Sequence, residues 1–100
     1  MSPGNRPVTI TIRSGPTVDK DRVTMGREGD EVLFVADPPS MRFEVKFDSS
    51  TPFERDHFHN NGPDTHRTGQ YDRNKRGEHK YTVKVPGHPD LDPVIIVDGS

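Results

Sequence analysis

The chain has 100 residues, with 14 basic and 16 acidic side chains, a net charge of −2 and no cysteine. This length indicates a single domain with one modest hydrophobic core, residues 1–100. The near balance of charge argues against general nucleic-acid binding, which needs a clear basic excess. Without cysteine, disulfides, thiolate catalysis and cysteine-ligated metal sites are excluded.

The first predicted strand is "PVTITIR", residues 7–13. Val8, Ile10 and Ile12 alternate with threonines, which is the period-two pattern of a half-buried strand. It is short, uncharged in the middle and rich in β-branched residues. We therefore expect it at a sheet edge, where a partner protein or a second copy of the chain can pair with it.

Three further strands are predicted before residue 48. "DRVTM", residues 21–25, is a short candidate, and Val32–Ala36 is an apolar run of strand length that ends at two prolines. "MRFEVKFD", residues 41–48, is the clearest strand, because its apolar and charged side chains alternate without exception up to Phe47.

Residues 48–77 are predicted to be one long polar loop that is partly mobile. Only Phe53, Phe58 and Tyr71 in this segment are hydrophobic. The segment cannot bury enough apolar surface to offset the entropy of ordering all of it. We expect Phe53 and Phe58 to dock on the core and residues 60–76 to be poorly ordered.

Two strands close the chain, "EHKYTVKV" and "VIIVD", separated by the turn "PGHPDLDP". Six or so strands joined by glycine and proline turns, with no convincing helix, predict an all-β Greek-key sandwich. The predicted core is Val8, Ile10, Ile12, Val23, Val32, Phe34, Phe43, Val45, Phe47, Tyr81, Val83, Val85, Ile95 and Val97.

The order of these strands resembles the cupredoxin family, within the wider group of immunoglobulin-like sandwiches. The segments that carry the resemblance are "VTITI", "GDEVLFVA", "MRFEVKF" and the closing run from Tyr81 to Val97. In that run Val85 stands where the family has its cysteine ligand, His88 matches the histidine ligand, and Leu91 stands where the family has methionine. The resemblance implies a cupredoxin-like fold without blue-copper ligands, so we expect no cofactor and apolar packing at that end.

His88 has two interpretations. We expect it to be a partly exposed turn residue, hydrogen-bonded to a backbone group or to Asp90 or Asp92, because one imidazole alone binds metal weakly. In the other interpretation it contributes to a metal site.

The histidines of the long loop are the better metal candidates. On an extended backbone, His57 and His59 fall on one face, where two imidazoles can reach one Cu²⁺ or Zn²⁺ ion. Candidate further ligands are His66, Asp56 and Asp64. A polar surface loop without metal is the competing interpretation, and we favour it, because His-x-His without a fixed third ligand is a weak signal.

Residues 67–80 carry five basic side chains and Tyr71. One interpretation is an arm that binds phosphate or RNA, with Tyr71 stacking on a base. Because Asp72 and Glu78 interrupt the charge, we expect a solvated loop and no nucleic-acid partner.

The leading functional prediction is a non-catalytic small β-sandwich domain that acts as a binding, interaction or structural module. No GxSxG, Walker or HExxH motif supports an enzyme. The alternative is a Cu- or Zn-binding protein that uses His57, His59, His66 or His88. We expect a cytoplasmic location by default and no membrane association, since no signal peptide is evident, and a periplasmic or secreted one if a signal was removed.

Overall fold

The computed structural model of the chain describes residues 6–48, 50–60 and 66–97, and these residues form eight strands and no helix. The strands are β1 (Pro7–Arg13), β2 (Thr17–Val18), β3 (Arg22–Met25), β4 (Glu31–Asp37), β5 (Glu44–Phe47), β6 (His57–His59), β7 (Gly77–Lys84) and β8 (Val94–Val97). The prediction of an all-β domain is confirmed for this part of the chain. Each predicted strand is present, and β2 and β6 were not predicted.

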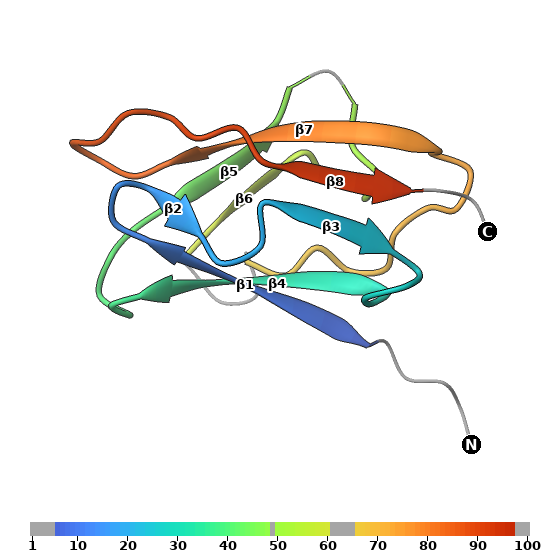
Figure 1. The fold of residues 1–100 in the computed structure, drawn as a ribbon, viewed down its shortest axis with the longest axis horizontal. Coiled ribbons are helices and arrows are strands. Elements are labelled where there is room, and N and C mark those ends of the chain that lie inside the picture. The colour runs from blue at the N-terminus through green and yellow to red at the C-terminus, as the bar shows by residue number, and fades with distance from the viewer. Residues whose placement is uncertain (1–5, 49, 61–65, 98–100) are drawn as a thin grey trace.

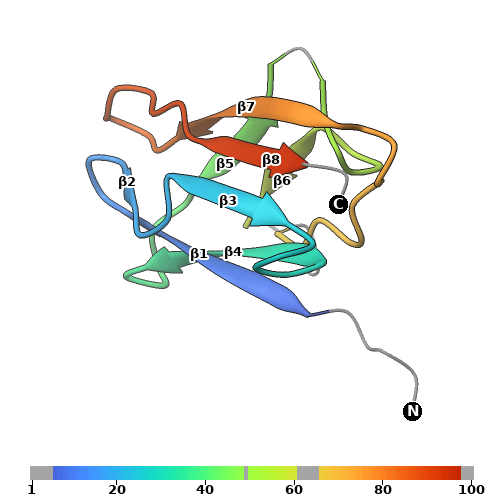
Figure 2. The same ribbon diagram turned by 45° about the vertical axis from the view of Figure 1, so that its right-hand side comes forward.

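The strands form two mixed sheets (Figure 1). The smaller sheet has the order β2-β1-β4, with β1 and β4 parallel from the pair Pro7↔Glu31 to the pair Arg13↔Asp37. The larger sheet has the order β3-β8-β7-β5-β6, in which β3 and β8 are parallel and the other neighbours are antiparallel. A view turned by 45° shows β1 and β4 on one side of the molecule and β5, β7 and β8 on the other (Figure 2).

Alternation of apolar and polar side chains determines which face of each strand is buried. In β5, for example, Val45 and Phe47 are buried whereas Glu44 and Lys46 are exposed. Every residue of the predicted core is buried. The core also contains Met25, Phe53, Phe58 and Tyr71.

Aromatic contacts join the two sheets. The Phe34 ring of β4 lies 5.7 Å from the Tyr81 ring of β7 and 6.0 Å from the Phe58 ring of β6, measured between centroids. The Phe43 ring, just before β5, lies 6.5 Å from Phe34 in an edge-to-face arrangement. Such pairs contribute beyond the area that they bury, so Phe34 fixes how the small sheet sits on the large one.

The polar segment 48–77 supplies part of this core. Phe53 and Phe58 are buried, as predicted, and their rings pack edge to face at 6.1 Å. Tyr71 is also buried, at 9% exposure, although it stands alone among polar residues in the sequence. Three aromatic side chains therefore tie a segment of low hydrophobicity to the rest of the domain.

The backbone of the same segment follows the outer edge of β4. The Phe34 N–H donates to the His66 carbonyl at 3.0 Å, and the Thr68 N–H donates to the Val32 carbonyl at 3.0 Å. The Val32 N–H in turn donates to the Thr68 hydroxyl oxygen at 2.8 Å. These bonds attach residues 66–68 to β4. The poor order expected of residues 60–76 stays a prediction, and residues 61–65 of that range lie outside the described residues.

An ion pair reinforces this attachment. The Glu31 carboxylate at the start of β4 is 1% exposed, and both the Nε and Nη2 atoms of Arg67 donate to it, at 3.2 and 2.8 Å. Arg55 donates to the Arg67 carbonyl at 2.9 Å and lies over the Phe58 ring. A buried charge without its partner is costly, so Glu31 requires Arg67 to stay in place.

The prediction that β1 is an exposed sheet edge is wrong. β1 lies between β2 and β4, and β2 pairs with its last two residues, Ile12 and Arg13. Beyond β2, Asp19 accepts from the Thr11 N–H at 2.9 Å and the Lys20 ammonium donates to the Thr9 carbonyl at 3.0 Å. Burial alone would raise the pKa of Asp19, but its hydrogen bonds with Thr11 and Lys20 outweigh burial and lower it.

One buried polar group in the core has no partner among the described residues, the hydroxyl of Tyr81. Burial raises the pKa of Tyr81 well above its ordinary value of 10.0, and the charges of Asp19 and Asp21 raise it further. The unfolded chain therefore releases this proton near pH 10 while the native protein keeps it. Stability contributed by this group is present at neutral pH and is lost as the pH rises above 10.

Phe47→Ala should lower the free energy of unfolding by ~3–5 kcal/mol, because the ring packs against Phe53, Phe58 and Tyr81. Phe43→Ala should lower the free energy of unfolding by a similar amount. Lys46→Ala, on the opposite face of the same strand, is the matched control and should change it by less than ~0.5 kcal/mol. Urea unfolding measures all three. A loss below about 1 kcal/mol at both phenylalanines would refute the inward register of this strand.

Tyr81→Phe should leave the free energy of unfolding at pH 7 unchanged or raise it by up to ~1 kcal/mol, because it removes an unpaired buried hydroxyl. The variant should also lose less stability than the wild type between pH 7 and about pH 10.5. Urea unfolding at the two pH values tests both points. A loss above about 1 kcal/mol at pH 7 would mean that the hydroxyl has a hydrogen-bond partner.

Candidate functional site

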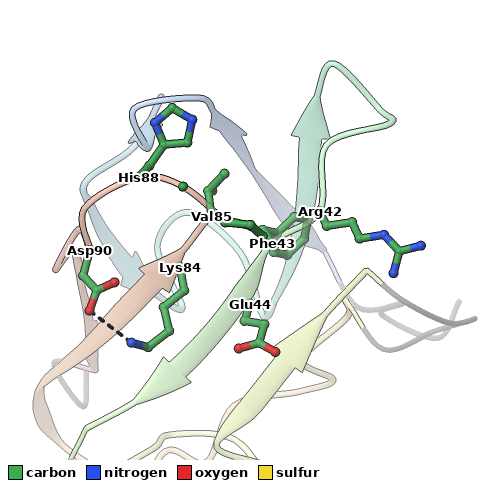
Figure 3. A pocket seen from close by; sticks show the side chains of 9 residues that line it. Arg42, Phe43, Glu44, Lys84, Val85, His88 and Asp90 are labelled. Carbon is green, nitrogen blue, oxygen red and sulfur yellow. Dashed lines mark hydrogen bonds and ion pairs between the residues drawn. The ribbon is translucent and has the colours of Figure 1, made fainter.

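Two adjoining hollows of about 380 and 520 Å³ lie at one end of the molecule. They share Arg42, Val85, Pro86 and His88, and we call them together the end groove. The groove lies between the chain that enters β5 and the turn that follows β7 (Figure 3). Glu44 and Lys84, a cross-strand pair of β5 and β7, form the part of the groove that belongs to the sheet, and the rest of its lining comes from the neighbouring loop and turn.

The turn after β7 has the sequence requirements of a type II β-turn. The His88 N–H donates to the Val85 carbonyl at 3.0 Å, Pro86 stands at the second position and Gly87 at the third, with a φ of +84°. Proline fixes the second φ and glycine tolerates the positive third one. This turn presents the exposed His88 side chain above the groove (Figure 3).

Charged side chains of both signs line the rim of the end groove. The Lys84 ammonium and the Asp90 carboxylate pair at 3.1 Å across the turn, and both side chains are half exposed. Arg42 and Glu44 stand on the opposite wall, with Arg42 pointing away from His88 (Figure 3). The rim therefore offers hydrogen-bond donors and acceptors around a partly apolar floor.

Apolar side chains occupy the positions that correspond, in the cupredoxin resemblance, to soft metal ligands. Val85 is 5% exposed and belongs to the core. Leu91 is half buried and exchanges two backbone hydrogen bonds with Val83, at 2.8 and 3.2 Å. Neither side chain has an atom that can bind a metal.

The expected hydrogen bond of the His88 side chain to a backbone group, to Asp90 or to Asp92 stays a prediction. Asp90 accepts from Lys84 at 3.1 Å, and Asp92 accepts from the Thr82 hydroxyl at 3.1 Å. The histidine is a turn residue, as expected, but its contribution is to the rim of the end groove.

His57 and His59 lie on β6, which pairs with β5 at the edge of the larger sheet. Their ring centroids are 5.5 Å apart, so the prediction that both point to one face is confirmed. The buried Phe58 between them points to the core, which is why the two imidazoles face outward.

Those of the other predicted ligands that the structure describes are not brought to this pair. His66 lies beside β4 and offers its carbonyl to Phe34, while the Asp56 carbonyl accepts from the Phe47 N–H. Asp64 lies outside the described residues. Within the described ranges no three His, Asp or Glu side chains are grouped so that they could hold a metal ion.

His79 was not among the predicted site residues, yet it is buried at 4% exposure. Its Nδ1 lies 2.8 Å from the Ser50 hydroxyl and its Nε2 lies 2.6 Å from the Lys75 carbonyl. The alternation of β7 places residue 79 on the inward face with Tyr81, so the sequence held a signal for its burial. Both ring nitrogens are used to tie the polar segment to β7.

The interpretation of residues 67–80 as a nucleic-acid arm loses its stacking residue. Tyr71 is buried. Its hydroxyl oxygen lies against Gly26, 2.7 Å from the position that a Cβ atom on that residue would occupy. Arg67 pairs with Glu31. Tyr71 and Arg67 thus serve the fold.

Comparisons with protein-family models, with curated proteins and with solved structures gave no match. No helix that could cross a membrane is found in the described part of the chain.

Proposed function

We propose that this chain is a non-catalytic recognition domain, a cupredoxin-like Greek-key β-sandwich without copper ligands that binds a partner segment in the end groove. The single observation that carries the proposal is the groove itself. It combines an apolar floor, a rim of both charges and a rigid turn in one place on the surface.

The arrangement of the strands supports the sandwich. Both sheets contribute to one hydrophobic cluster, and Phe34 packs on rings from the opposite sheet. The order β7-β5-β6 is not sequential, because the chain leaves β6 and returns on the other side of β5. A return beside the first strand of a hairpin is one step of a Greek key, which has four strands.

The dimensions of the end groove support binding. Its two parts, about 380 and 520 Å³, fall within the range of ~300–1,000 Å³ that is usual for ligand sites. The floor contains Val85 and half-buried Met41. Pro86 and Pro38 stiffen the two walls, which reduces the entropy lost when a ligand is held.

The occupant that fits best is an extended peptide segment of a partner protein. One apolar side chain of the segment would cover Val85 and Met41, while Arg42 and Glu44 would hold its polar groups. A small apolar contact inside a charged rim is the usual composition of a weak, specific protein interface.

A library of random peptides displayed on phage tests this function with the full chain as bait. Selected peptides, resynthesised, should bind the wild type and lose about ten-fold or more of their affinity for Arg42→Glu and for His88→Glu, since reversing or introducing a charge in an interface costs more than about 1 kcal/mol. Arg73→Glu, an exposed charge reversal on the loop before β7, is the matched control and should bind as the wild type does.

Peptides that bind Arg42→Glu, His88→Glu and the wild type equally would place recognition elsewhere and overturn the proposal. Failure to select any peptide with the folded chain would also count against it. Thermal unfolding of each variant verifies that both exposed substitutions leave the fold intact.

A further inference from the structure

We propose that the outer face of β6 is a binding site for a divalent transition metal ion, with the imidazoles of His57 and His59 as its two fixed ligands and Cu²⁺ as the preferred ion. This site lies on the edge strand of the larger sheet, and its neighbour Glu44 also lines the end groove. The observation that carries it is the juxtaposition of the two rings at 5.5 Å on one exposed strand.

The backbone holds the two histidines in a fixed relation. The Phe47 N–H donates to the Asp56 carbonyl at 2.8 Å, so Phe47 and Asp56 form a hydrogen-bonded pair. From this pair onwards, hydrogen-bonded and non-hydrogen-bonded pairs alternate along β5 and β6. The next pair, Lys46↔His57, and the pair Glu44↔His59 are therefore non-hydrogen-bonded pairs, in which side chains lie closest. Phe58, buried between the histidines, prevents β6 from turning over.

The separation of the rings is close to what a shared ion requires. Imidazole nitrogens bind Zn²⁺ or Cu²⁺ at about 2.0–2.1 Å, so two rings on neighbouring coordination positions have centroids roughly 4.5–5 Å apart. The observed separation of the two ring centroids is 5.5 Å, and small side-chain rotations would bring it to that range. His57 is exposed and His59 half exposed, so water can complete the coordination shell.

The cross-strand neighbours of the two histidines act in opposite directions. Glu44 stands opposite His59 on the same outward face, and its exposed carboxylate can rotate towards a bound ion as a third ligand. Lys46 stands opposite His57 and places a positive charge beside the ion. Substitutions of Glu44 and Lys46 therefore test the metal site through the charge beside the ion, in addition to substitutions that remove the histidine ligands.

Imidazole with one carboxylate suits Cu²⁺ and Zn²⁺, and the general order of affinity places Cu²⁺ above Ni²⁺ and Zn²⁺. Protons compete with the ion for the imidazole nitrogens, so affinity falls as the pH is lowered. The exposed position and the small number of fixed ligands imply moderate affinity.

Titration of Cu²⁺ into the purified, tag-free chain, followed by electron paramagnetic resonance and by thermal unfolding, tests the proposal. We expect one bound ion with nitrogen hyperfine structure and a melting temperature raised by about 5 °C or more at saturation. His57→Ala and His59→Ala should each weaken binding by about ten-fold or more, while His88→Ala, the matched exposed histidine, should not.

The charge variants keep both imidazoles and so do not depend on the alanine variants folding well. Lys46→Glu should tighten Cu²⁺ binding and Glu44→Gln should weaken it, because each alters charge beside the ion. Equal affinity in wild type and in the double variant His57→Ala/His59→Ala would overturn the site. Unchanged affinity in both charge variants, or no nitrogen coupling in the spectrum, would overturn it as well.

Discussion

The rest of the structure depends on one requirement: the backbone N–H and C=O groups on the second edge of β4 must be hydrogen-bonded. One edge of β4 pairs with β1 along its whole length, and the other would present unpaired N–H and C=O groups beside the core. Residues 66–71 satisfy that edge: His66, Thr68 and Tyr71 bond to β4 or to Asp30 just before it. Because these residues belong to the polar segment 48–77, the described part of that segment is an integral part of the domain.

The composition explains why the fold is built in this way. With only 27% hydrophobic residues, the regular strands provide too few large side chains for a closed core in a chain of 100 residues. The polar segment supplies the missing large side chains, which are those of Phe53, Phe58 and Tyr71. Burying Phe58 requires a short extended stretch against β5, and that stretch is β6. The outward position of His57 and His59, and hence the proposed metal site, is a consequence of packing Phe58.

Much of the fold could be predicted from the sequence, because strands with a strict period of two reveal both their existence and their buried face. The pattern from Met41 to Phe47 is an example, and its register is as predicted. β6 could not be predicted with equal ease: a single apolar residue between two histidines is too short a signal for a strand. The position of β1 inside its sheet could not be predicted either, because parallel pairing with β4 joins residues that are distant in the sequence.

The candidate sites were predictable in unequal measure. Facing histidines two residues apart follow from strand geometry alone, and the structure agrees for His57 and His59. The end groove was not foreseen, since it needs two turns from different parts of the chain to meet, with Arg42 on one wall and His88 on the other. Only tertiary structure brings those residues together.

Native-state hydrogen exchange of the β4 amides tests most directly whether residues 48–77 are integral to the fold. The Val32 and Phe34 N–H groups donate to Thr68 and His66, so their exchange requires residues 66–68 to leave β4. We expect both to exchange with an opening free energy within about 1 kcal/mol of that for global unfolding. Leu33 pairs with Thr9 of β1 and provides the comparison. Rapid exchange at Val32 and Phe34 while Leu33 stays protected would contradict the claim that residues 66–68 are integral to the fold.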